Sequence, residues 1–167
     1  MLRIGSHISS AKGYAAMGHT ARRIGATTFA FFLRNPRGGN AKALDEKDVA
    51  VFLDMAAEDR LGPLVAHAPY TMNACSQKEN IREFSRMVMD EDLRRLAYTP
   101  GNYYNFHPGG AGGQDKETCF DLIADQLNRF LTADMQTVVL LETMSGKGSE
   151  IGGSFGELRE VLDRVER

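Results

Sequence analysis

The sequence predicts an α/β fold built on a parallel β-sheet, and two patterns carry that prediction. Short apolar runs with the β-branched and aromatic residues of buried strands alternate with longer stretches whose apolar residues recur at helical spacing. The alternation runs through the chain with no linker or low-complexity tract, so residues 1–167 are expected to form one domain. Strict alternation of this kind makes the strands parallel and covers the sheet with helices.

Each element can be placed in order along the chain. The expected strands are the apolar runs at residues 2–5, 27–32, 64–67, 102–106 and 137–141. The expected helices follow them at residues 13–24, 46–58, 78–97, 116–131 and 155–165. Gly25 is suited to closing the first helix and Asp45 to capping the second, while Pro100 and Gly101 interrupt the chain after the third.

Two arrangements share this element order, an open doubly wound sheet and a (βα)8 TIM barrel. The first strand is not followed by the G-x-G-x-x-G turn of dinucleotide-binding sheets, and the glycines around Lys147 lack the spacing of a phosphate-binding P-loop. A barrel is therefore favoured. Because a complete barrel typically has ~250 residues, we expect a partial barrel of about five βα units.

Composition narrows the class of protein. The chain is 43% hydrophobic and 25% charged, which is ordinary for a globular domain, and it has no run long enough to span a membrane. Its first residues do not resemble a signal peptide, so we expect a cytoplasmic protein with no membrane partner. Cys75 and Cys119 have neither disulfide-framework nor zinc-binding spacing and are expected to be packing or surface thiols.

Charge is distributed unevenly although the net charge is only −2. Residues 1–43 contain no Asp or Glu, and the first acidic residue is Asp45. The cations of this stretch are Arg3, Lys12, Arg22, Arg23, Arg34, Arg37 and Lys42. A basic block on an acidic remainder predicts a surface that meets a polyanion. Arg22 and Arg23 are the exceptions, since we expect them to be solvated helix positions.

Three potential metal ligands end three successive apolar runs: His67, His107 and Glu142. Because the carboxyl ends of parallel strands converge on one face of a barrel, we expect these side chains to meet around one cation. Two neutral imidazoles and a carboxylate are suitable zinc ligands and leave a position open for water. The alternative is that the histidines are strand-end residues satisfied by hydrogen bonds.

These residues belong to motifs in which the chain resembles the endonuclease IV family, the abasic-site endonucleases also called deoxyribonuclease IV or AP endonuclease family 2. The motifs are Ile-Gly-Ser-His-Ile-Ser at 4–9, Phe-Ala-Phe-Phe at 29–32 with Asn-Pro-Arg at 35–37, Ala-His-Ala-Pro-Tyr at 66–70, Asn-Phe-His-Pro-Gly at 105–109, and Leu-Glu-Thr at 141–143 with Gly-Lys-Gly at 146–148. Five ordered matches are far more specific than any single motif. The resemblance implies a TIM barrel, of which this chain is the N-terminal portion.

The resemblance also implies zinc-dependent hydrolysis of the phosphodiester 5′ to abasic sites in double-stranded DNA, within base excision repair. In the family one of three zinc ions is held at positions that correspond to His67, His107 and Glu142, and the glutamate also bridges to a second zinc, so Glu142 is the expected catalytic residue. The remaining ligands belong to later strands and have no counterpart here. With the ligands of only one ion present, we expect weak or absent activity from this chain alone.

The loop at residues 33–42 combines cations, amides and glycines on the predicted catalytic face, which suits contact with DNA phosphates. In the family, side chains of this loop and the next enter the duplex at the lesion. Arg37 and Tyr70 occupy matching positions, and Asn35 lies in the same motif. Tyr70 is equally comfortable as a packed strand-end tyrosine. His7 matches the end of the first strand, where we expect it to line the pocket rather than bind metal.

Two other functions remain open. Metal-binding TIM barrels that resemble xylose isomerase share the strand-end ligand pattern, which permits a sugar isomerase or epimerase. The acid-free N-terminal block weighs against a small neutral substrate. A non-catalytic, metal-stabilised DNA-binding remnant is the second alternative. The chain also departs from the family at Gly110 and Ala111, where Ser-His is usual, which changes the loop but not the ligand before it.

A partial barrel leaves its first and last strands unpaired. The fifth expected strand, residues 137–141, is apolar, β-branched and uncharged. An edge of this kind pairs readily with another chain. We therefore expect self-association through the open edges of the barrel.

Overall fold

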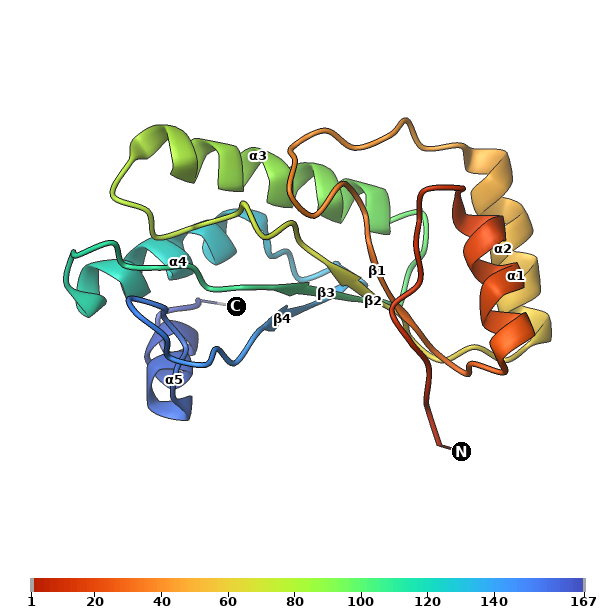
Figure 1. The fold of residues 1–167 in the computed structure, drawn as a ribbon. Coiled ribbons are helices and arrows are strands. Elements are labelled where there is room, and N and C mark those ends of the chain that lie inside the picture. Colours follow the sequence, from red (N-terminus) through yellow and green to blue (C-terminus); the bar gives the residue numbers. More distant parts are fainter. Residues whose placement is uncertain (1, 167) are drawn as a thin grey trace.

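The computed structural model describes residues 2–166, which form a parallel β-sheet flanked by helices (Figure 1). The strands are β1 (Ala30–Phe32), β2 (Val65–His67), β3 (Tyr103–Phe106) and β4 (Val138–Leu141). The helices are α1 (Tyr14–Ile24), α2 (Glu46–Glu58), α3 (Glu79–Leu96), α4 (Lys116–Phe130) and α5 (Phe155–Leu162). The four strands pair in sequence order and are all parallel. The predicted α/β alternation is confirmed.

Local sequence explains where several helices begin and end. At the start of α2 the Asp45 carboxylate accepts hydrogen bonds from the backbone N–H groups of Lys47 and Asp48. Gly25 ends α1 with a φ of 67°, a left-handed conformation that disfavours residues with a Cβ. Both predicted boundaries are confirmed. Within residues 2–166, no helix has the length and apolar character needed to cross a membrane.

The expected first strand, residues 2–5, is wrong. Instead the chain runs beside β1 a little later and forms one parallel bridge, between His7 and Ala30. Leu2 and Ile4 are 76% and 61% exposed, so the rest of the described chain does not bury their side chains. An apolar segment forms a regular strand only where its side chains pack against neighbours. That packing is missing here, and a bridge replaces the strand.

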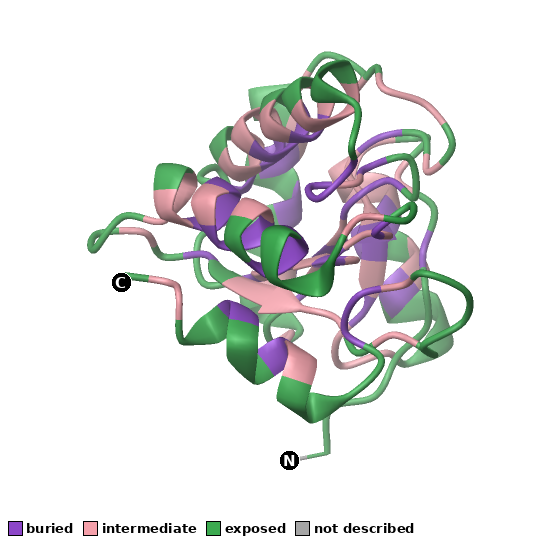
Figure 2. Ribbon diagram, turned by 90° about the vertical axis from the view of Figure 1, so that its left-hand side faces the viewer, coloured by how far each residue is buried: buried purple, intermediate pink, exposed green. Residues whose placement is uncertain are grey.

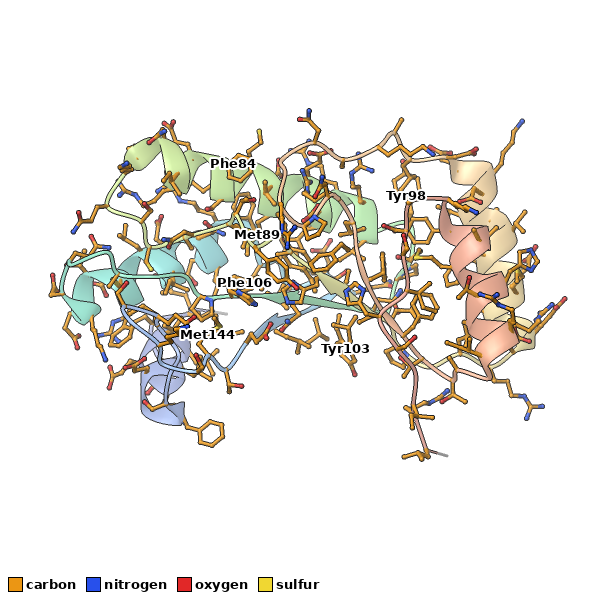
Figure 3. All side chains as sticks on the ribbon, viewed as in Figure 1. Phe84, Met89, Tyr98, Tyr103, Phe106 and Met144 are labelled. Atoms are coloured by element: carbon orange, nitrogen blue, oxygen red, sulfur yellow. The ribbon has the colours of Figure 1, made fainter. Side chains whose placement is uncertain are left out.

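The two faces of the sheet differ in burial. Phe31, Ala66 and Tyr104 occupy one row across β1, β2 and β3, and all three are fully buried. Tyr103 lies on the opposite side of the sheet from Met89 of α3, as Figure 3 shows, and it is only half-buried. Side chains alternate between faces along a strand. One face therefore makes the core with the helices, and the other stays partly open.

The edge strand β4 is poorly covered. Figure 2 shows it mostly at intermediate exposure, between helices that carry the buried positions of α4 and α5. Val138 is 53% exposed. An apolar groove of about 600 Å³ follows this edge, with Phe106, Leu127 and Leu162 among its lining residues. The sheet thus ends in an apolar surface.

Candidate metal centre and nucleic-acid face

Three metal-binding side chains lie together at the carboxyl ends of β2, β3 and β4. His67 is the last residue of β2, His107 follows β3 and Glu142 follows β4. Glu142 Oε2 is 3.0 Å from His67 Nε2 and 3.4 Å from His107 Nε2. One ligand atom from each residue lies within 4.8 Å of the other two. The parallel sheet brings together three residues that lie far apart in sequence.

The arrangement fits a cation of the size of zinc. Ligand atoms bound to a tetrahedral zinc ion at its usual bond lengths are roughly 3.4 Å apart, close to the spacing found here. His67 Nδ1 lies 2.6 Å from the carbonyl oxygen of Ala68. A carbonyl oxygen can only accept, so Nδ1 donates its proton and Nε2 presents a lone pair toward Glu142. All three side chains are half-buried, which leaves an open side for water and substrate.

The surroundings favour neutral imidazoles, the form that binds metals. Burial lowers the pKa of His107; Glu142 raises it by a smaller amount, and His67 lowers it further. Burial and His67 also lower the pKa of His7. Histidines with lowered pKa values stay neutral over a wider pH range, which keeps Nε2 of His107 available as a ligand.

Asn105 is a site residue that sequence reasoning missed. Its Nδ2 atom donates a hydrogen bond to Glu142 Oε2, the oxygen that both histidines approach. The available signal was strand alternation, because Asn105 stands two residues before His107 and so points to the same face. A polar residue at such a position is a candidate partner for a neighbouring ligand.

Aromatic rings surround the histidines. The ring of Tyr70 is centred 5.6 Å from that of His67 and 5.5 Å from that of His107. Phe32 lies 5.1 Å from His67, and His7 packs on Phe32 at 4.6 Å. Tyr70 is 55% exposed, so it is a surface ring beside the site rather than a packed core tyrosine. His7 is outside the three-residue ligand group found in residues 2–166.

Two strand-end loops lie side by side and carry the residues expected to meet DNA. The Tyr70 N–H donates to the Pro36 carbonyl at 2.8 Å, which joins the loop after β2 to the loop after β1. The Arg37 N–H donates to Asn35 Oδ1 at 2.9 Å. Asn35 and Arg37 are both exposed, and Arg37 forms no ion pair with any residue between 2 and 166. Arg37 therefore offers a free positive charge on this face.

The expectation that the N-terminal cations share one surface is wrong for Arg34. Its guanidinium is fully buried and bonds to Asp92 of α3 at 2.6 and 2.9 Å, with Glu91 at 3.1 Å. The Tyr104 hydroxyl donates to the other Asp92 oxygen at 2.9 Å. Arg22 forms ion pairs with the end of α2, as its expected position on a helix surface allows. Arg34 anchors the loop after β1 instead of facing a partner.

The two cysteines are buried neighbours, not surface thiols. Both are 0% exposed, and Gln114 Nε2 donates to the Cys75 carbonyl and to Cys119 Sγ. Burial, with Cys119 nearby, raises the pKa of Cys75 to about 12. A buried, protonated thiol behaves as a small packing group. Of the two expected roles, packing is confirmed.

Known proteins with similar sequences have the same element order and the same kind of name. A sequence profile described as xylose isomerase-like TIM barrel matches residues 19–167. A curated relative from Akkermansia muciniphila, named probable endonuclease 4, is 55% identical over 98% of this chain and 59% of its own length. A relative of the same name from Clostridium botulinum is 52% identical over 99% of this chain and 60% of its own.

A solved structure has the same fold. The crystal structure of endonuclease IV from Thermus thermophilus aligns with a TM-score of 0.82 at 30% identity, over 96% of this chain and 59% of that one. The chain spans 59–60% of the length of the curated relatives it matches. Its parallel sheet is accordingly part of a barrel. The chain belongs to the xylose isomerase-like TIM barrel family and, within it, to the endonuclease IV proteins.

Proposed function

We propose that this chain carries one zinc site of an endonuclease of DNA repair that hydrolyses the phosphodiester 5′ to abasic sites. The observation that carries the proposal is the meeting of His67, His107 and Glu142 at strand ends, beside the loop that exposes Arg37. Two imidazoles and a carboxylate suit zinc, and an arginine with no acidic partner suits a phosphate. The names of the relatives support the same activity.

The ligand residues have distinct tasks in this proposal. His67 and His107 each present Nε2, and the bond from His67 Nδ1 to the Ala68 carbonyl keeps that ring in orientation. Glu142 supplies the negative charge, and its second oxygen leaves it able to serve a neighbouring ion. A bound zinc ion would polarise water and neutralise charge on the phosphoryl oxygens. No side chain is required as a covalent nucleophile.

The loop residues would hold the DNA. Arg37 would bind a backbone phosphate, and Asn35 would offer an amide to the same strand. The exposed ring of Tyr70 would pack against a sugar or base where the duplex is interrupted. His7, which rests on Phe32, would line the pocket beside the metal ligands. Because the described residues hold the ligands of one ion, we expect cleavage by this chain alone to be weak or absent.

Zinc content and strand cleavage test the metal site together. We expect close to one zinc per wild-type chain after excess metal is removed, and a marked loss in His107→Ala. His19→Ala is the matched control because His19 is exposed on α1, away from the ligand group. Equal zinc content in the two variants would contradict the site.

The same preparations separate the alternatives. Salt-dependent binding to an abasic duplex with weak zinc-dependent nicking supports the endonuclease. Binding with no nicking, even at high protein concentration, favours the non-catalytic DNA-binding remnant. Neither binding nor nicking favours the sugar isomerase, which an aldose isomerisation assay would then test.

A further inference from the structure

Asn105 lies between two of the metal-binding residues in the sheet. The register of the parallel strands pairs His67 of β2 with Asn105 of β3, and Asn105 with Leu140 of β4, two residues before Glu142. Its amide donates to Glu142 Oε2. That oxygen is also the atom 3.0 Å from His67 Nε2 and 3.4 Å from His107 Nε2. A single neutral donor thus holds the carboxylate oxygen at the centre of the ligand group.

The main chain of the same residue reaches the other side of the site. The Ala68 N–H donates to the Asn105 carbonyl at 2.8 Å. The Ala68 carbonyl in turn accepts the proton of His67 Nδ1 at 2.6 Å. Asn105 therefore contacts Glu142 through its side chain and supports His67 through its backbone. Replacing the side chain removes the first contact and leaves the second in place.

Folding alone does not explain an asparagine at this position. Asparagine is depleted in strands, and Asn105 lies on the half-buried face of the sheet rather than in the core. Its strand pairing uses backbone groups only. The amide makes one side-chain hydrogen bond among the described residues, to Glu142. The position thus favours a donor directed at the carboxylate.

We propose that Asn105 is a positioning residue of the metal centre, whose amide fixes the Glu142 carboxylate so that Oε2 faces the two histidines. The inference rests on the proposed zinc site and adds a residue to it. Carboxylates that bind metals are usually held by hydrogen bonds of this kind, and removing such a partner typically weakens metal affinity roughly 10–100-fold. Asn105 would act through Glu142 and would not itself bind the ion.

The test measures zinc affinity in the full chain by competition with a chromophoric chelator. Asn105→Leu keeps a side chain of similar size and removes the donor, and Asn105→Ala removes both. Asn128→Leu is the matched control, because Asn128 is a half-buried asparagine on α4 that bonds to the backbone of Arg164 and Glu166. Circular dichroism and thermal unfolding of the metal-free proteins report whether each variant folds.

We expect both Asn105 variants to bind zinc roughly 10- to 100-fold more weakly than wild type, while Asn128→Leu loses thermal stability and keeps its zinc affinity. Unchanged zinc affinity in either folded Asn105 variant would overturn the positioning role and leave the zinc site standing. A folded wild-type chain that binds no zinc would overturn both. An equal loss of zinc affinity in Asn128→Leu would reduce the effect to general destabilisation and also overturn the inference.

Discussion

Three arginines of the acid-free N-terminal stretch have different surroundings. Arg34 is buried against Asp92, Arg22 forms surface ion pairs with the end of α2, and Arg37 is exposed without an acidic partner among residues 2–166. A buried pair holds the chain in place, and a surface pair contributes little. Only a cation without a partner has its full charge available to a phosphate. The same residue type therefore has three separate roles.

At this scale we predict that Arg37→Ala weakens binding to an abasic duplex more than Arg22→Ala does. Loss of one phosphate contact lowers the slope of log affinity against log salt by about 1. Fluorescence anisotropy over a series of salt concentrations measures both quantities. Indistinguishable affinities for the two variants would contradict the assignment of Arg37 to the DNA-facing loop.

Two helices depend on carboxylates that are not part of their own N-cap. α1 begins after Gly13, which has no side chain to accept a hydrogen bond, and Asp48 of α2 supplies the acceptor for the Tyr14 and Ala15 N–H groups at 2.5 and 3.2 Å. Before α5, Glu157 accepts from the Gly152 N–H at 2.8 Å. Contacts of this type fasten neighbouring elements and satisfy donors that are otherwise unpaired.

We predict that Asp48→Ala destabilises the protein by about 0.5–2 kcal/mol, the usual cost of losing a helix cap. The change leaves the α1 N–H groups without an acceptor and loosens the contact between α1 and α2. Urea unfolding followed by circular dichroism measures the loss. Asp54→Ala, an exposed position on the same helix, is the control. A cost no larger than that of the control would show that water replaces the carboxylate without penalty.

Glu157 gives a pH-dependent prediction for the start of α5. Hydrogen bonding to Lys116, and to backbone N–H groups, lowers its pKa from the ordinary value of 4.5. A carboxylate whose pKa is lower in the folded state stabilises the fold above its unfolded pKa, and the contribution disappears as pH falls through the folded pKa. We therefore expect Glu157→Gln to be less stable than wild type at pH ~7, with the difference shrinking below pH ~4.5.

Denaturant unfolding of both proteins across this pH range measures the difference. Glu83→Gln is the control, because Glu83 is exposed on α3. We expect that control to match wild type at every pH. A stability gap between Glu157→Gln and wild type that stays constant down to acidic pH would contradict the linkage.

The whole molecule ends in an apolar edge. β4 pairs with β3 on one side only within the described chain, Val138 is 53% exposed, and the groove of about 600 Å³ continues the apolar surface onto α4 and α5. Unpaired strand edges attract other chains unless charge or a covering element protects them. No Lys, Arg, Asp or Glu lies between Thr137 and Leu141 to give such protection.

We predict that the isolated chain self-associates through the β4 edge. Sedimentation velocity should show species larger than the monomer, and Val138→Lys should shift the population toward monomer by placing a charge on the edge. Val51→Lys is the matched control, since Val51 is 50% exposed but lies on α2. A wild-type chain that stays monomeric and unfolds cooperatively would contradict the prediction.

The sequence by itself determined the element order and the three metal-binding residues. Hydrophobic period distinguishes strands from helices within a few residues, so β2, β3 and β4 could be located without knowledge of the rest of the chain. Parallel alternation then requires the strand ends to converge, which brought His67, His107 and Glu142 to one point. Both steps depend on local pattern and on one general rule of topology.

Only the tertiary structure decided which side chains pair across the fold. Arg34 and Asp92 are 58 residues apart in sequence, and Asn105 and Glu142 are 37 apart, so no local pattern joins them. Residues 2–5 have the composition of a strand, but a strand also needs neighbours that cover its side chains. Composition and period express what a segment prefers. Burial, ion pairing and the position of Asn105 depend on what lies next to it in space.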